Sequence, residues 1–230
     1  MLAAEVSGLS NTFIYHKVFD TNVLGLLKFV DFINIHKICS KIVFVSSMTI
    51  YSPLNEIPIK ENSIKTPQPH IYGLSKYIGE EIINFVCYHT DIKSLIIRIP
   101  GLFGGDRKSG YIYNAIKAIN KNQDFTIYFD NLEYWECADV NDIAEMLIEL
   151  INEYNWQRDS ETFNLSYGKE IKFSEIPYFI KDYLGSESKI YRHGISSLRS
   201  FYLDNEKIKA IIDFNYDFNS ALIRYINRLI

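Results

Sequence analysis

Cysteine is scarce in this sequence, and its few cysteines follow no ligand pattern. The 230 residues include 3 Cys, at Cys39, Cys87 and Cys137. Their odd number and the lack of a CxxC or Cys/His spacing argue against a disulfide framework and against a zinc site. The 5 His show no ligand spacing either, so we predict no bound metal. Such cysteine usage is typical of a reducing cytoplasm.

Long apolar runs and clustered charge are missing as well. Hydrophobic residues make up 47% of the chain, yet no run approaches the ~20 residues that a transmembrane helix needs. The amino terminus, MLAAEVSGLS, lacks the basic region and the apolar stretch of a signal peptide. The net charge is -4 and the basic residues are scattered, which gives no electrostatic footprint for nucleic acid or an anionic membrane. We therefore expect a soluble, cytoplasmic protein with neither partner.

Helices and buried strands alternate along the chain. Short β-branched runs such as KIVFVSS do not alternate in polarity, which is typical of parallel strands covered on both faces. This order predicts an α/β fold with a doubly wound parallel sheet, and no clean linker separates a second domain. Helices are predicted over 22–33, 71–90, 111–122, 140–154, 173–185 and 219–230, and strands over 41–47, 94–100, 125–129 and 162–166.

Two serines and a tyrosine–lysine pair are the candidate chemical groups. An apolar strand runs straight into Ser46 and Ser47, either because the chain simply turns there or because the strand delivers a hydroxyl to a reaction centre. Tyr72 and Lys76 stand four apart in a predicted helix and so share a face. A nearby ammonium lowers the pKa of a phenol from about 10, which would let Tyr72 exchange a proton near neutral pH.

The surroundings distinguish this pair from a second one. Tyr113 and Lys117 repeat the spacing, and so short a pattern recurs by chance. Only Tyr72 lies between two covered strands, the first of which ends in serines. Since open α/β sheets bind ligands at the carboxyl ends of their strands, we expect Ser47 and Tyr72 to meet there, and we assign chemistry to Tyr72 and Lys76 alone.

Five segments, taken in order, resemble the motifs of a known family. They are LAA, NVLG, IVFVSSMTIY, YGLSKYIGEE and RIPGLFGG. In order and spacing they resemble the extended short-chain dehydrogenase/reductase family, the NAD-dependent epimerase/dehydratase group that acts on nucleotide sugars. The resemblance implies a partial Rossmann-like sheet with a smaller, interwoven C-terminal lobe. It assigns 1–100 and 135–166 to the NAD(P)-binding domain, and 101–134 and 167–230 to the substrate-binding lobe.

The resemblance also implies roles for individual residues. Ser47 would bind the reacting sugar hydroxyl or ketone, Tyr72 would move its proton, and Lys76 would lower the tyrosine pKa and hold the nicotinamide ribose. Hydride would pass to or from NAD or NADP. The implied cofactor-binding residues are Asn22, Ser46, Tyr72, Lys76, Pro100 and Gly101. The implied substrate-binding residues are Ser47, Thr49, Arg107 and Lys108.

Some of these positions have simpler interpretations. Asn22 begins a predicted helix and could be its cap. Arg107, Lys108 or Arg192 could supply the positive charge for the substrate phosphates, but residues of this kind are more often solvated surface residues. Glu80 and Glu81 are predicted to form the solvent face of the helix that carries Lys76.

The family's glycine-rich turn is missing from the sequence. No GxxGxxG stretch links a strand to a helix, and Gly104 and Gly105 are predicted to form a turn only. MLAA resembles the end of the family's fourth strand, so about 60 residues, two βα units, would precede it. We therefore expect a truncated, split or partial chain with an uncovered sheet edge, and weak or no dinucleotide binding unless another polypeptide completes the fold.

Further departures concern the substrate. Gly101 and Trp135 stand where many nucleotide-sugar epimerases have an Asn and an Arg that contact the diphosphate. Met48 and Thr49 follow Ser47 where the dehydratases have Asp-Glu, which disfavours a 4,6-dehydratase. We therefore predict an epimerase or a reductase, and the sugar and the choice of NAD or NADP stay open. The alternative is a non-catalytic remnant with the same fold. The family's two dimer helices are both present, which is compatible with a homodimer.

Overall fold

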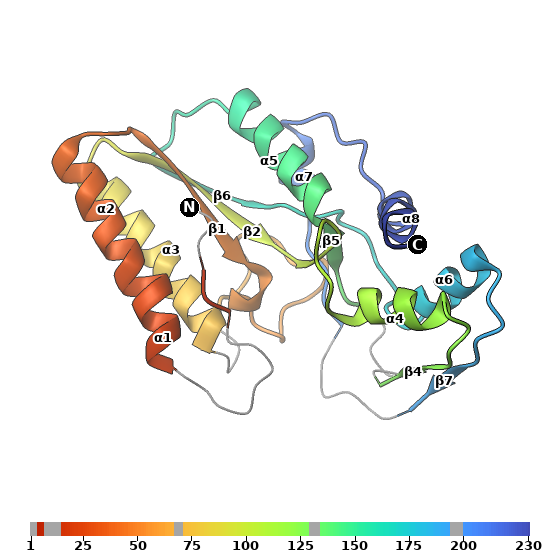
Figure 1. Ribbon diagram of the computed structural model, residues 1–230. Helices are drawn as coiled ribbons and strands as arrows, with labels where there is room; N and C mark the ends of the chain where they lie inside the picture. The colour runs from red at the N-terminus through yellow and green to blue at the C-terminus, as the bar shows by residue number, and fades with distance from the viewer. Residues whose placement is uncertain (1–3, 7–14, 67–70, 129–133, 194–199) are drawn as a thin grey trace. The chain divides into compact units, whose positions relative to one another are not determined.

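The computed structural model describes residues 4–6, 15–66, 71–128, 134–193 and 200–230, which belong to two compact units (Figure 1). Both units are discontinuous in sequence. The first comprises Met1–Glu56, Lys60–Ile99 and Tyr154–Leu165, and the second comprises Ile57–Ile59, Pro100–Glu153 and Ser166–Ile230. The chain passes between the units after Ile99, Glu153 and Leu165, and around Ile57–Ile59. The assignment of a cofactor-binding and a substrate-binding part stays a prediction. Residues 135–153 pack with the second unit rather than the first.

A parallel sheet forms the centre of the first unit. Its strands are β1 (Lys41–Ser47), β2 (Lys93–Ile99) and β6 (Ser160–Asn164), in the order β1-β2-β6. Both pairings are parallel, as the unalternating β-branched runs predicted. β1 lies at one edge of this described sheet, and its last residue, Ser47, is in register with Ile99. The carboxyl ends of β1 and β2 therefore finish level with each other.

α3 (Ile71–His89) packs against β1 and β2 in the first unit, and α1 (Tyr15–Phe19) and a π-helical turn (Asp20–Leu24) pack against α3. α2 (Gly25–His36) runs beside α3 in Figure 1. An apolar core joins α2 and α3 to the two strands, through residues such as Leu26, Phe44 and Ile83. The first helical segment begins earlier than predicted, because Asn22 lies inside it rather than at its start.

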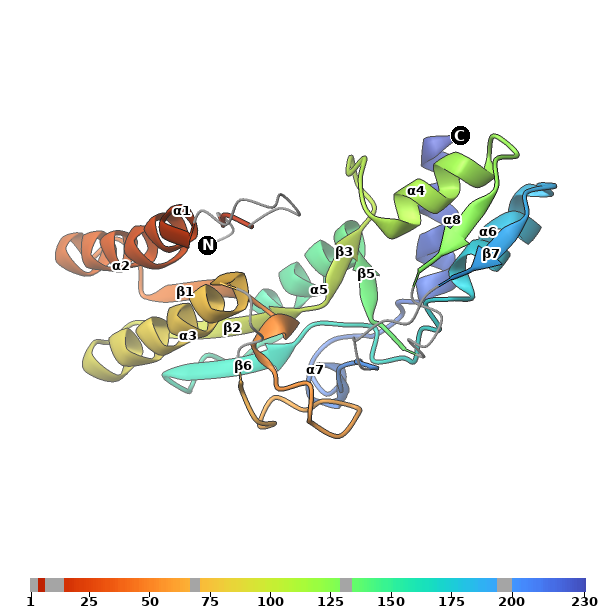
Figure 2. The ribbon, with the colours of Figure 1, turned by 90° about the horizontal axis from the view of Figure 1, so that it is seen from below.

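The second unit combines short strands with longer helices. β3 (Gly101–Phe103) pairs with β5 (Cys137–Asp139), and β4 (Phe125–Ile127) pairs with β7 (Ile190–Arg192), in both cases in parallel. Figure 2 shows β4 and β7 beside two of the helices, α4 and α6. The helices are α4 (Tyr111–Ile119), α5 (Val140–Glu153), α6 (Ile176–Leu184), α7 (Glu206–Lys209) and α8 (Phe218–Leu229). None of the helices in the described parts of the chain has the length and apolarity needed to span a bilayer.

Candidate active site

Ser47 closes β1 and also starts the next turn. Its hydroxyl oxygen accepts a hydrogen bond from the backbone N–H of Thr49 at 3.2 Å and one from the Thr49 hydroxyl at 3.0 Å. These bonds cap the 3-10 turn Met48–Ile50. Thr49, which we predicted at the substrate, therefore holds the Ser47 side chain. The turn that we considered as an alternative to a chemical role is present, and it fixes the hydroxyl in place.

The structure brings Ser47 and Tyr72 together as predicted, because the Ser47 side chain lies near enough to the Tyr72 phenol for hydrogen bonding to affect its pKa. Tyr72 lies in the first turn of α3, which approaches the turn after Ser47 very closely. A Cβ on Gly73 would lie 2.9 Å from the carbonyl oxygen of Thr49, a separation that only glycine permits without a shift of backbone. The glycine next to the tyrosine therefore allows the two hydroxyls to come together.

The pKa of Tyr72 moves in the opposite direction to our prediction. Burial raises the pKa of the phenol above its ordinary value, and the hydrogen bond with Ser47 only partly opposes that rise. We predicted that Lys76 would lower this pKa. The prediction is wrong for this structure, because the Lys76 ammonium lies 5.8 Å from the centre of the Tyr72 ring and donates instead to the carbonyl oxygen of Val45 at 2.8 Å.

Lys76 is a buried cation on the inner face of α3. Only 5% of its surface is exposed, and its ammonium also lies 5.1 Å from the centre of the Phe44 ring. Burial lowers the pKa of Lys76 to about 8, since the charged form loses its hydration. One of its three N–H donors goes to Val45. The others are the groups that could hold a ribose hydroxyl.

Burial distinguishes the two tyrosine–lysine pairs. The Lys117 ammonium lies 5.9 Å from the centre of the Tyr113 ring, nearly the same separation as in the first pair. Lys117 is exposed, however, whereas Lys76 is buried. The spacing thus gives the same local geometry twice, and the fold desolvates only one of the two lysines.

Asn22 and Ser46 have structural partners that the sequence did not indicate. The Asn22 side chain accepts a hydrogen bond from the Glu5 N–H at 2.7 Å and donates to the Glu5 carbonyl at 2.9 Å and to the Ser75 hydroxyl at 2.9 Å. Asn22 therefore bonds both the N–H and the carbonyl of Glu5, as the backbone of a neighbouring strand would. The interpretation of Asn22 as a helix cap is wrong. The Ser46 hydroxyl donates to Glu80. The cofactor contacts of Asn22 and Ser46 stay predictions.

Glu80 lies in the interior rather than on the solvent face of α3. It has no exposed surface, and its carboxylate accepts bonds from Ser46 at 2.6 Å and from two guanidinium nitrogens of Arg98 at 3.0 and 2.8 Å. Our prediction was therefore wrong for Glu80, because β2 supplies a buried cation that compensates the charge. It holds for Glu81, which is exposed and pairs with Lys65 at 2.9 Å.

The same guanidinium reaches two further segments. Arg98 donates to the Tyr51 hydroxyl at 2.8 Å and to the Glu61 carbonyl at 2.7 Å, and the Tyr51 hydroxyl donates to Asn164 at 2.6 Å. None of these residues was among our candidates. The signal was in the sequence, since Arg98 is a charge within an otherwise apolar strand, and a buried charge requires a partner.

Arg107, which we predicted at the substrate, lies at a small cavity of the second unit. Its volume is about 140 Å³, and its lining includes Gly101, Arg107, Tyr111, Trp135 and Phe173. Arg107 donates to the Leu102 carbonyl at 2.8 Å. A cation and several aromatic rings thus share one cavity, a combination suited to an anionic ligand with an aromatic ring.

The other predicted positions near this cavity differ in exposure. Lys108 is exposed, and Pro100, which we predicted at the cofactor, is buried. Arg192 packs against Tyr178, with the guanidinium 5.6 Å from the ring centre. Their predicted roles stay predictions.

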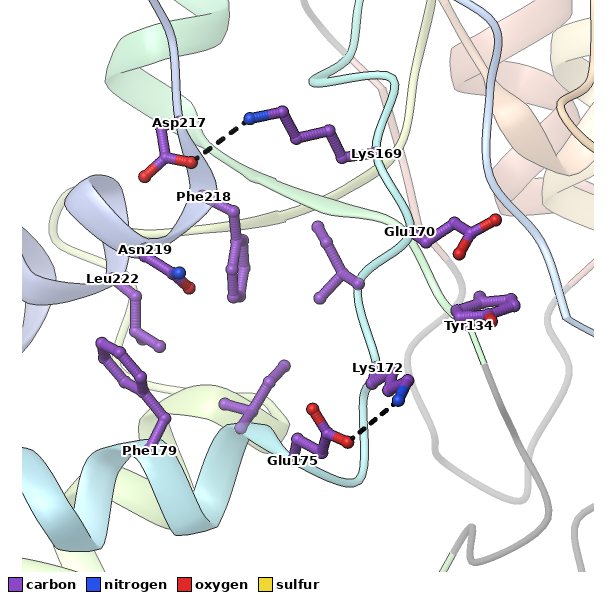
Figure 3. Close-up of a pocket in the computed structure, with 12 residues that line it drawn as sticks. Tyr134, Lys169, Glu170, Lys172, Glu175, Phe179, Asp217, Phe218, Asn219 and Leu222 are labelled. Carbon is purple, nitrogen blue, oxygen red and sulfur yellow. Dashed lines mark ion pairs between the residues drawn. The ribbon is translucent and has the colours of Figure 1, made fainter.

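A second, larger cavity of the second unit involves none of our predicted site residues. Its volume is about 380 Å³ (Figure 3). Phe179, Phe218 and Leu222 give it an apolar lining, and two ion pairs lie at its margin. The ammonium and carboxylate groups are 3.5 Å apart in Lys169–Asp217 and 3.3 Å apart in Lys172–Glu175.

Comparison with known proteins establishes the family. The model of the NAD dependent epimerase/dehydratase family matches residues 1–166. This chain belongs to that family. It is 30% identical over 207 residues to a putative UDP-glucose 4-epimerase of Methanocaldococcus jannaschii, covering 84% of this chain and 63% of that protein. It is 27% identical over 171 residues to the UDP-glucose 4-epimerase of Mycoplasma genitalium, covering 66% of this chain and 50% of that protein. The chain thus spans less than two thirds of either curated relative.

A solved structure confirms the fold of this epimerase/dehydratase family member. The crystal structure of UDP-glucose 4-epimerase from Thermotoga maritima with UDP-glucose matches with a TM-score of 0.85 and 18% identity, over 99% of this chain and 75% of that one. At this identity the likeness shows the fold alone. The predicted Rossmann-like α/β fold and the resemblance to the extended short-chain dehydrogenase/reductase family are therefore confirmed.

The residues fit one end of the family's dinucleotide. Lys76 and Tyr72 provide donors suited to a nicotinamide ribose. In this family a glycine-rich turn that opens a helix usually binds the cofactor pyrophosphate. Gly104 and Gly105 do not form such a turn, because they have positive φ in a turn after β3 and α4 begins only at Tyr111. Within the described parts of the chain, the groups therefore suit the nicotinamide end of the cofactor and not its phosphates.

Proposed function

We propose that this chain is the catalytic and substrate-binding part of an NAD(P)-dependent nucleotide-sugar epimerase. The observation that carries the proposal is the close approach of the start of α3 to the turn after Ser47, which puts Tyr72 beside Ser47, with the buried Lys76 one turn further along the same helix. The names of the curated relatives and of the matching crystal structure support a UDP-hexose as the substrate.

Each of the three residues would have a distinct task. The Ser47 hydroxyl, fixed by Thr49, would bind the sugar hydroxyl that reacts. Tyr72 lies beside Ser47 and, because burial raises its pKa, it carries the phenolic proton, so it would give this proton to a sugar ketone oxygen and take it back from the resulting hydroxyl. Lys76 would hold the nicotinamide ribose. When bound, NAD(P) supplies the site that accepts and returns hydride.

The missing phosphate cradle limits this proposal for the chain alone. The sequence contains no GxxGxxG turn, so we expect these residues to bind NAD(P) weakly. A reductase would use the same three residues without recycling its cofactor. It stays open beside the epimerase, because Gly101 stands where many epimerases have an asparagine. A non-catalytic protein of the same fold is the other alternative.

A pair of tyrosine variants tests the proposal. Tyr72→Phe removes only the phenolic oxygen, so conversion of UDP-glucose to UDP-galactose should fall by about 10²-fold or more, with NADH binding unchanged. Tyr88→Phe, at a tyrosine of the same helix that is 82% exposed, is the matched control and should keep full turnover. Both substitutions are tested in the 230-residue chain and in a version extended by any in-frame upstream coding sequence. Equal turnover of Tyr72→Phe and the parent protein would contradict the proposal.

We also propose a homodimer that forms through α2 and α3. Both helices present large apolar side chains to solvent, among them Ile35, 72% exposed, and Phe85, 66% exposed. Other exposed members are Leu27, Phe29, Phe32, Leu74 and Tyr88. Exposed apolar surface on adjacent helices indicates an interaction face, and a second copy would offer the same surface.

A further inference from the structure

A charged pair lies buried next to the reacting hydroxyls. Glu80 has no exposed surface and Arg98 has 3%. Their side chains form two hydrogen bonds, of 3.0 and 2.8 Å, in the two-pronged geometry that suits a guanidinium and a carboxylate. Such a pair stabilises a fold weakly at best, since apolar residues of similar size often replace it without loss. Its position therefore needs a reason other than stability.

The position of Glu80 along α3 supplies one. Glu80 follows Lys76 by four residues and Tyr72 by eight, so all three lie along one side of the helix. The Glu80 carboxylate accepts the Ser46 hydroxyl at 2.6 Å, and the Lys76 ammonium donates to the carbonyl of Val45 at 2.8 Å. Two consecutive residues of β1 are thus attached to this helix immediately before Ser47.

The chain after Ser47 is held by the same guanidinium. Arg98 donates to the Tyr51 hydroxyl at 2.8 Å, and Tyr51 ends the short turn that follows Ser47. Ser47 is therefore fixed on both sides, by Ser46 before it and by Tyr51 after it. The two attachments meet at the ion pair between Glu80 and Arg98.

We propose that Glu80 is a positioning residue, which is held by Arg98 and sets the contact between Ser47 and Tyr72 through the hydroxyl of Ser46. The inference rests on the proposed function, because it assigns Glu80 a task in that same site. Glu80 itself touches neither substrate nor cofactor. It acts by keeping the end of β1 at a fixed distance from α3.

Ser46→Ala is the mildest test, because it removes the hydrogen bond between Ser46 and Glu80 and leaves the ion pair between Glu80 and Arg98 in place. Ser94→Ala is its matched control. Ser94 is equally buried, at 1% exposed, and its hydroxyl bonds to Ser160 at 2.9 Å near the opposite end of the same sheet. Ser46→Ala should lower kcat for UDP-glucose by about tenfold or more with little change in KM, since small misplacements of reacting groups are costly. Ser94→Ala should leave both unchanged.

A second pair of variants addresses the carboxylate itself. Glu80→Gln keeps the shape of the side chain but removes its charge, and Glu81→Gln makes the same change at the next, exposed position. Only Glu80→Gln should lower kcat. Urea unfolding of all four variants shows whether a loss of turnover merely follows a loss of stability.

The titration of Tyr72 reports the geometry without any turnover. Fluorotyrosine incorporated throughout the protein gives a ¹⁹F resonance for residue 72, assigned by its loss in Tyr72→Phe. The Ser47 hydrogen bond lowers the pKa of this phenol, so an upward shift is expected in Ser46→Ala and Glu80→Gln but not in the controls. An unshifted titration in Ser46→Ala, or an equal shift in Ser94→Ala, would overturn the inference. If the parent protein shows no turnover and Ser46→Ala still shifts the titration, the positioning role stands and the epimerase proposal fails.

Discussion

Lys76 combines a proposed catalytic task with an unfavourable location. Its folded-state pKa of about 8 lies below the ordinary lysine value of 10.5. The unfolded chain therefore binds the proton more tightly than the native state does. The stability contributed by this group is present above pH 10.5 and is lost as the pH falls through about 8. At neutral pH the buried ammonium is thus a cost to the fold.

Lys76→Met should therefore stabilise the protein at pH 7 while abolishing turnover. We expect the free energy of unfolding to rise by about 1 kcal/mol or more, a net value that includes the loss of the hydrogen bond to Val45. The gain should shrink between pH 8 and pH 10, as the wild-type lysine becomes neutral. Urea unfolding at several pH values measures this. Lys117→Met, at the exposed pair, should change the free energy of unfolding by less than about 0.5 kcal/mol. Equal effects of the two substitutions would contradict the argument.

At this scale the sequence indicates residues with distinctive chemistry better than residues that support them. Ser47 and Tyr72 could be predicted to meet, because strand ends and helix starts gather at one edge of a parallel sheet. The burial of Glu80 could not be predicted from helical spacing alone, since spacing identifies a face but not what covers it. The pKa direction of Tyr72 also depended on burial, which is a property of the folded chain.

At the scale of elements, the contact between α3 and β1 depends on a glycine. A Cβ on Gly79 would lie 2.5 Å from the tip of the Phe44 ring, closer than real contacts allow. Gly79→Ala should therefore destabilise the protein by about 1–3 kcal/mol through overpacking. Gly25→Ala, inside α2, is the matched control. Its nearest neighbour would be the Asp20 carbonyl oxygen at 3.4 Å, so the better helix propensity of alanine should add up to about 1 kcal/mol.

Chemical denaturation of the two alanine variants measures both effects. A stabilised Gly79→Ala would show that the Phe44 ring moves aside at no cost, and the close packing of α3 on β1 would then not depend on glycine. The same variant should also weaken the Lys76 contact with the Phe44 ring, which is 5.1 Å from the ammonium.

The long elements could be predicted from the sequence, and most of the short ones could not. The helix over 71–90 is observed as Ile71–His89 because its apolar periodicity extends over enough residues, and the strand over 41–47 is observed as Lys41–Ser47 because its apolar run is continuous and β-branched. β3, β5 and β7 have 3 residues each, too few to show a period. Their pairing depends on segments that are distant in sequence.

At the scale of the whole molecule, the exposed faces of α2 and α3 predict self-association. Phe85→Lys should convert a dimer to a monomer, because a charge would be buried at the centre of the face. Ile148→Lys, at a residue 60% exposed on α5 of the other unit, is the matched control and should leave the dimer intact. Light scattering after size-exclusion chromatography measures the mass. A monomer for the unmodified chain at high concentration would refute the proposal.

The interleaving of the two units also has a consequence for synthesis. The sheet of the first unit takes β1 and β2 from before residue 100, and β6 from Ser160–Asn164. Between them the ribosome must make Pro100–Glu153, which belongs to the other unit. A nascent chain that ends at residue 153 therefore holds Arg98 and Tyr51 without Asn164, the acceptor of the Tyr51 hydroxyl at 2.6 Å. The growing chain cannot complete one unit and then begin the other, so the final hydrogen bonds around Arg98 form late in translation.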